Sequence, residues 1–206
     1  TGEMEIYICR WARPTGEAIE AVIDRKAQTL TGLETADYAV YTRVAESKPA
    51  QGIRYPIEWE VTNKRDQPLH VRLAATGDPH IEIDHSRDFV LQAGETRTLQ
   101  ASYRCASDAP RLDISIWRPK PTPQIKTLVV LDEEEMLLGT GLQYKPAVEI
   151  SLHPSPLTLM PGATQRVLVQ LKSHVKRALA GELEIVSAVG LQTSWQRIAF
   201  AADAEG

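Results

Sequence analysis

The residues best suited to hold a metal ion are His80, Glu82, Asp84 and His85, within the segment His80-Ile-Glu-Ile-Asp-His. In an extended strand, alternate side chains share a face, so successive members of the set His80, Glu82 and Asp84 lie about 7 Å apart. Bonds to Zn²⁺ are about 2 Å long, so neighbours at this spacing share one ion only if the strand bends. We therefore expect a polar face exposed to solvent, with these four residues as the metal-ligand candidates.

The strongest run of charge is Asp132-Glu-Glu-Glu135, which offers carboxylate oxygens of the kind that Ca²⁺ prefers. The spacing of a Ca²⁺-binding loop, with its turn glycine, is missing from this run. A short acidic run of this kind is typical of a solvated loop or strand end. We expect no metal ion there.

Motifs for nucleophilic catalysis or nucleotide binding are missing from the sequence. It contains no Gly-x-Ser-x-Gly, and neither Cys9 nor Cys105 sits in a catalytic motif. No glycine-rich phosphate loop precedes a helix. Each of the five histidines falls in a turn or on the outward side of a predicted strand. The sequence thus predicts no catalytic residues, no cofactor and no enzyme activity.

Four aromatic and apolar side chains are the candidates for binding a partner. Trp117 follows Ile116 on an outward face, and Trp11 lies just past the equivalent strand, whereas Trp59 and Trp195 fall on inward faces and are expected in the core. Exposed aromatic residues anchor glycans and protein partners. The alternative is that they cover a neighbouring strand. The interaction candidates are Trp11, Trp117, Ile6 and Ile8.

The elements that position these residues are predicted to be short β-strands. Residues 55–62 and 68–74 alternate apolar and polar side chains, and a polar segment ending in Pro68 lies between them, which predicts a hairpin. About seven such strands between Tyr38 and Trp117 have the regular spacing of a β-sandwich. We therefore predict an all-β fold.

The sequence carries an internal repeat. A shift of 108 positions lays residues 5–24 on residues 113–132 with five identical residues, and lays the strand at 40–44 on the strand at 148–152. Repeats of this kind indicate an array of similar units. The expected organisation is a terminal strand of a preceding repeat or a donated strand (1–13), a linker (14–36), a complete domain (37–121), a second linker (122–146) and an incomplete second domain (147–206). We expect both linkers to be extended.

Two segments carry a resemblance to a known class of domain. Residues 89–103 and residues 157–171 each have a short apolar strand, a glycine turn and a long alternating strand, as in the Ig-like accessory domains of bacterial proteins. The segment from Tyr55 to Leu73 is similar to the matching hairpin. The resemblance implies tandem immunoglobulin-like β-sandwiches and a spacer or accessory role, and it implies no site residues.

Composition narrows the range of partners. The 206-residue chain has 43% hydrophobic residues and a net charge of −4 with mixed signs, which suits a folded domain and disfavours nucleic acid as a partner. No apolar run approaches the roughly 18 residues that a transmembrane helix needs, so we expect no membrane insertion. A periplasmic or extracellular location fits the resemblance best, with a cytoplasmic complex as the alternative.

These observations favour a non-catalytic structural or interaction module, acting as a spacer, scaffold or assembly subunit. Its partner is expected to be a protein or a second copy. In one interpretation residues 4–11 supply a strand that completes the incomplete sandwich of another copy, and in the other the sequence is a segment of a longer array. The alternative is a carbohydrate- or ligand-binding accessory domain of a larger enzyme, with a glycan as its partner.

Overall fold

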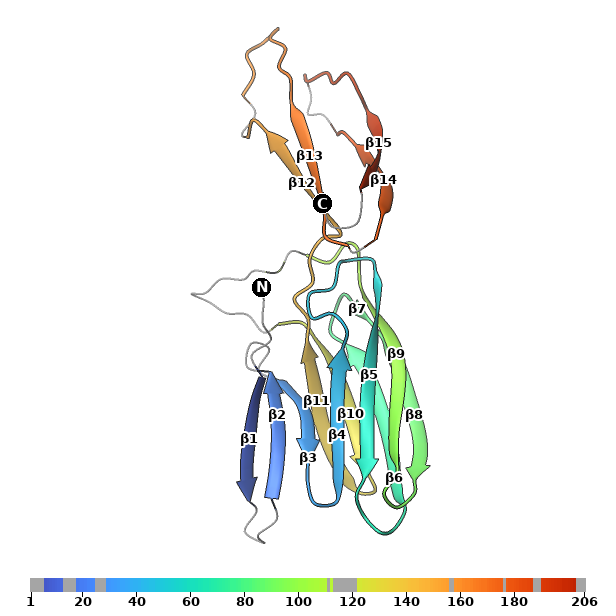
Figure 1. Cartoon of the computed structure of the whole chain (residues 1–206). Helices are drawn as coiled ribbons and strands as arrows, with labels where there is room; N and C mark the ends of the chain where they lie inside the picture. Colours follow the sequence, from blue (N-terminus) through green and yellow to red (C-terminus); the bar gives the residue numbers. More distant parts are fainter. Residues whose placement is uncertain are drawn as a thin grey trace. The chain divides into compact units, whose positions relative to one another are not determined.

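The fold is all-β, as predicted. The computed structural model describes residues 6–12, 18–24, 29–110, 112, 122–155, 158–175, 177–186 and 190–202. All regular structure in these residues is β-strand, β1 to β15, and every paired strand is antiparallel to its neighbour (Figure 1). Over the same residues, no helix has the length and apolar character needed to cross a membrane.

The chain divides into two compact units, Thr1–Lys145 and Pro146–Gly206, called here the first and second units. The first unit contains two sheets. The larger has the order β1 (Ile6–Ala12), β2 (Ala18–Asp24), β3 (Thr29–Glu34), β4 (Tyr38–Val44), β5 (Arg54–Asn63), β9 (Thr96–Cys105) and β7 (Ile81–Glu82). The smaller has the order β11 (Glu134–Gly141), β10 (Gln124–Leu131), β6 (Leu69–Gly77) and β8 (Asp84–Leu91).

Alternation along the strands builds one core between the two sheets. Ile57 and Trp59 on β5 and Val71 and Leu73 on β6 are fully buried, and they belong to one hydrophobic cluster. Successive strand residues face opposite sides, so each sheet turns one apolar face inward and one polar face to solvent. The expected burial of Trp59 is confirmed.

The predicted hairpin between β5 and β6 is wrong. β5 pairs with β4 and β9, whereas β6 pairs with β8 and β10, so the turn after Asn63 carries the chain from one sheet to the other. Alternation determines which side of a strand is apolar but not which strand pairs with it. Two strands that face each other across a core have the same pattern as two strands side by side.

The segments expected as linkers are extended, but they belong to the sheets of the first unit. Residues 14–36 include β2 and β3, and residues 122–146 include β10 and β11. β10 pairs with both β6 and β11, which buries Ile125, Val129 and Leu131. The segment that was expected to be an extended linker is therefore a core strand, with Ile125, Val129 and Leu131 on its inner face. Of the strand expected at 111–117, the structure describes only Leu112.

The second unit has two separate hairpins, β12 (Val148–His153) with β13 (Leu168–Ser173) and β14 (Leu179–Glu184) with β15 (Arg197–Ala202). Among its described residues only Ser173 and Val175 are buried. Trp195, expected in the core, is 61% exposed. It precedes the start of β15 at Arg197, so strand alternation does not determine its direction.

Candidate functional site

The metal-ligand candidates do not form one site. Ile81–Glu82 is a strand of the larger sheet and Asp84–Leu91 a strand of the smaller one, so the chain changes sheets within the expected strand. His80 lies in the turn before β7 with φ of 71°. Over the described part of the chain, no three residues of the types His, Cys, Asp and Glu lie close enough to hold a metal ion.

Glu82 is instead part of an ion pair on the surface. The guanidinium of Arg104 donates to both of its carboxylate oxygens, at 2.7 Å from Nη2 to Oε1 and 3.0 Å from Nε to Oε2. The hydrogen bonds from Arg104 lower the pKa of Glu82. This geometry joins β7 to β9 and leaves the carboxylate engaged by Arg104.

His85 is buried, in contrast to the surface position expected for every histidine. Its ring stacks on Trp59 with 5.1 Å between the ring centroids and an interplanar angle of 11°, and its Nε2 has no hydrogen-bond partner. Burial lowers the pKa of His85. The sequence did carry a signal for this burial. His85 lies four residues after the buried Ile81, and residues an even number apart share a side of an extended chain. It faces Ala75 across the sheet, where a small side chain leaves room for the ring.

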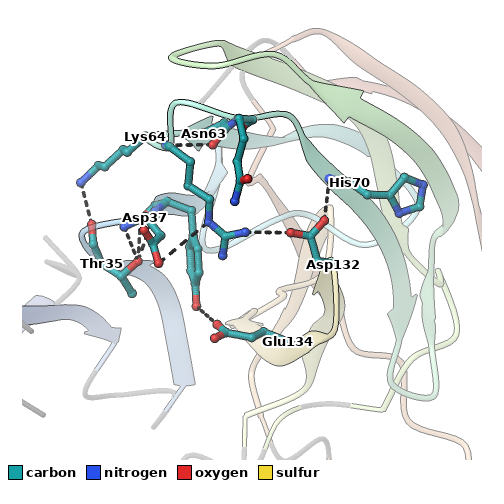
Figure 2. Close-up of polar contacts among 10 residues, drawn as sticks. Thr35, Asp37, Asn63, Lys64, His70, Asp132 and Glu134 are labelled. Atoms are coloured by element: carbon teal, nitrogen blue, oxygen red, sulfur yellow. Dashed lines mark hydrogen bonds and ion pairs between the residues drawn. The ribbon is translucent and has the colours of Figure 1, made fainter. Parts of the chain in front are cut away.

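A group of polar side chains lies where strands of both sheets turn in the first unit (Figure 2). We call it the polar cluster. Its residues come from the β3–β4 turn and the start of β4, from the end of β5 through the start of β6, and from the β10–β11 turn with the start of β11: Thr35, Asp37, Tyr38, Asn63, Lys64, Arg65, His70, Asp132 and Glu134.

Asn63 holds the centre of the crossing between the sheets. Its side chain is fully buried, and Nδ2 donates to the carbonyl oxygens of Gln67 at 2.8 Å, Gln92 at 3.0 Å and Leu91 at 3.3 Å. Its Oδ1 accepts from the backbone N–H of Arg65 at 3.0 Å. One side chain therefore joins the end of β5 to the turn that follows β8.

Arg65 and Asp132 extend this network to the β10–β11 turn. Arg65 Nη1 lies 2.7 Å from Asp132 Oδ2, and Asp132 Oδ1 accepts from the backbone N–H of His70 at 3.0 Å. Asp132 has φ of 52°, in the left-handed region that Asp tolerates better than most residues. On the other side of the network, Tyr38 donates its hydroxyl to Glu134 at 2.8 Å.

The polar cluster thus connects strands of the two sheets through hydrogen bonds and ion pairs. Its carboxylates at Asp132 and Glu134 accept hydrogen bonds or ion pairs from within the protein. Lys64 donates to the carbonyl oxygen of Thr35 at 3.0 Å and also contacts Glu34. The acidic run that suggested a Ca²⁺ site therefore begins with a carboxylate paired to Arg65.

The interaction candidates lie at the outer edge of the larger sheet, as far as the structure describes them. β1 is the terminal strand of that sheet, and the side chain of Ile8 is 57% exposed. For Ile6 and Trp11 the structure describes the backbone positions in β1 but not the side chains, and Trp117 lies outside the described residues. Cys9 is an exposed free thiol on the same strand.

Most of the large apolar side chains that are exposed among the described residues lie in the second unit. Val186 is 88% exposed, and the others in this unit are Ile150, Leu152, Met160, Leu168, Leu191 and Trp195. Sequence reasoning placed Trp195 in a core, but the structure leaves it exposed. Exposed apolar side chains form a contact site for a protein or a ligand where they adjoin one another.

Comparisons with known proteins give no family. No protein-family model matches the chain, and no curated protein matches it. A search of solved structures finds a β-glucosidase from Listeria innocua in complex with gluconolactone, which is 14% identical over 52% of this chain, with a TM-score of 0.25. The match spans 16% of that enzyme's chain, and at this TM-score it carries no argument about fold or function.

Proposed function

We propose that this chain is a non-catalytic structural and interaction module, a spacer, scaffold or assembly subunit built from tandem immunoglobulin-like β-sandwich repeats. The observation that carries the proposal is the exposed apolar surface of the second unit, exemplified by Val186, Met160 and Leu168. Burying such side chains stabilises an association by about 25 cal/mol for each Å² of apolar surface removed from water. The surface therefore favours contact with another protein surface.

The titratable residues described above support the same proposal, because their contacts join strands. Glu82 pairs with Arg104 between β7 and β9, and Asp132 pairs with Arg65 across the turns. Burial raises the pKa of the Cys105 thiol to about 11, which keeps it protonated and poorly nucleophilic at neutral pH. These groups contribute to the fold rather than to chemistry.

A dye that fluoresces on apolar surfaces tests the proposal directly. We expect the native chain to bind anilinonaphthalene sulfonate, and the triple variant Met160→Gln, Leu168→Ser and Val186→Ser to lose most of the fluorescence. Leu137→Ser is the matched control, because Leu137 is a comparably exposed residue of the first unit. A native chain that does not bind the dye, or a triple variant that binds it unchanged, would contradict the proposal.

The alternative is a carbohydrate-binding accessory domain of a larger enzyme, and the exposed indole of Trp195 favours it. An aromatic ring open to solvent is the usual platform for a sugar ring. Affinity electrophoresis in gels containing xylan, β-glucan or chitosan separates the two readings. Retention that is lost in Trp195→Ala, or in the double variant Trp11→Ala and Trp117→Ala, would favour glycan binding. Unchanged mobility in all three polysaccharides favours the structural module.

A further inference from the structure

The β14–β15 hairpin of the second unit, like the β6–β8 pair of the first, has a phenylalanine on one strand opposite a residue of the other strand. Val71 on β6 is opposite Phe89 on β8, and Gly181 on β14 is opposite Phe200 on β15. A Cβ atom at Gly181 would lie 2.8 Å from the ring of Phe200, so the phenylalanine ring lies across the glycine. The 108-residue shift of the sequence repeat lays β6 (residues 69–77) on residues 177–185, which contain β14, so β14 stands at the position of β6 in the repeat.

One edge of β14 is open among the described strands. β6 pairs with β8 on one side and β10 on the other, whereas β14 pairs with β15 alone among the described strands. Ile185 N–H donates to the carbonyl oxygen of Gln196 at 2.9 Å, across the hairpin. Since backbone groups alternate in direction along an antiparallel strand, the N–H groups of Ala180, Glu182 and Glu184 point to the open edge. That edge is a template for another strand.

β1 is the strand of this chain that is available to fill it. β1 is seven residues long, ends the larger sheet and has one charged residue, Arg10, whose side chain is 77% exposed. The other free edges of the first unit are less suitable. β7 has only two residues, β8 has exposed charges at Asp84, Arg87 and Asp88, and β11 lies against β3. Short length and charge are the features that protect edges from pairing.

We infer that β1 of one copy pairs antiparallel with β14 of a second copy, with Arg10 opposite Glu182. Charge favours this register, because Glu182 and Glu184 are both exposed and Arg197, at 3.8 and 3.6 Å, is the cation that pairs with them among the described residues. Arg10, whose Nε binds Glu20 within the β1–β2 pair, would bring a second cation to them. The same register sets Cys9 opposite Leu183. The inference rests on the proposed function, of which it specifies the partner.

The faces of the two strands agree with this register. Cys9 is opposite Ala21 in the β1–β2 pair, and Ala21 is buried on the inner side of the larger sheet. Leu183 lies on the half-buried side of β14. Pairing therefore extends an apolar face with an apolar residue and a polar face with an ion pair. The contact uses two different edges, β1 of one copy and β14 of the next, and each copy has both. It therefore builds open chains rather than a closed dimer.

The first test is the mass of the full chain by light scattering across a broad concentration series. We expect the weight-average mass to rise above the 22.9 kDa of one copy and to keep rising with concentration. A mass that stays at 22.9 kDa throughout overturns the inference. The dye test of the proposed function does not depend on this outcome, because it measures residues outside β1 and β14.

Charge reversal tests the register. Arg10→Glu and Glu182→Arg should each weaken association about tenfold, or about 1.4 kcal/mol, and the double variant should restore it. Arg43→Glu is the matched control, because Arg43 pairs with Glu60 across β4 and β5 as Arg10 pairs with Glu20 across β1 and β2. Association that is unchanged in both single variants, or not restored in the double variant, overturns the register.

A proline tests the use of the backbone edge. Glu182→Pro removes an N–H that points to the open edge, and proline is tolerated on edge strands, so the hairpin should remain while association is lost. Glu182→Ala keeps the N–H and should retain more association than the proline variant. Circular dichroism checks that each variant is folded. Full association of a folded Glu182→Pro variant overturns pairing at β14.

Discussion

Replacing Asn63 with alanine should destabilise the first unit strongly. The side chain is fully buried, and its Nδ2 hydrogens serve the carbonyl oxygens of Gln67 and Gln92 at 2.8 and 3.0 Å, while Oδ1 accepts from the N–H of Arg65. Each such hydrogen bond contributes about 1 kcal/mol net, and buried groups left without a partner cost more. The free energy of unfolding should therefore fall by about 2–4 kcal/mol.

Urea unfolding followed by tryptophan fluorescence measures this loss, as a lower midpoint with an unchanged slope. Asn63→Asp should be at least as destabilising at neutral pH, because a carboxylate has no N–H to donate and would face carbonyl oxygens. Asp66→Ala, at an exposed position in the same segment, should stay within about 0.5 kcal/mol of the natural chain. A similarly small effect for Asn63→Ala would refute the role assigned to this residue.

Three further changes have effects that follow from the core. Burial lowers the pKa of His85, so as the pH falls the unfolded chain takes up a proton on this residue before the folded chain does. The free energy of unfolding should therefore decline below about pH 6.5. Urea titrations at a series of pH values should show that His85→Phe removes this dependence. Thr127→Val removes the hydroxyl that accepts from Trp59 Nε1–H at 3.0 Å, so the free energy of unfolding measured by chemical denaturation should fall by about 1–3 kcal/mol. An unchanged free energy would mean that the fold does not need this hydrogen bond. Gly77→Ala would place a Cβ 2.1 Å from the carbonyl oxygen of Ile81, so its melting temperature should drop clearly, and an unchanged value would contradict this close approach.

Alternation alone was enough to predict the all-β class and the inner faces of most strands in the first unit. It placed Trp59 in the core and Glu82 outside it, as the structure does. It did not give strand partners, because the pattern of β5 facing β6 across a core equals that of two neighbours in a sheet. The turn after Asn63 therefore looked like a hairpin turn, although its buried amide connects two sheets.

The candidate metal site depended on one strand continuing from His80 to His85. A change of sheet after Glu82 separates the two halves, and single-sequence alternation does not show such a break because parity is preserved across it. Trp195 was misplaced for a related reason. It precedes β15 in an irregular segment, where side-chain direction depends on loop conformation rather than on a two-residue period.

The place of β10 beside β6 has a consequence for synthesis. β6 and β8 leave the ribosome together, but the strand that closes the other edge of β6 ends only at Leu131. Until then the nascent first unit has an uncovered row of backbone groups beside Val71 and Leu73, a state in which growing chains are prone to misassembly. Contacts between segments so distant in sequence also form slowly. Any shortened version of this unit that stops before Gln124 should therefore aggregate rather than fold.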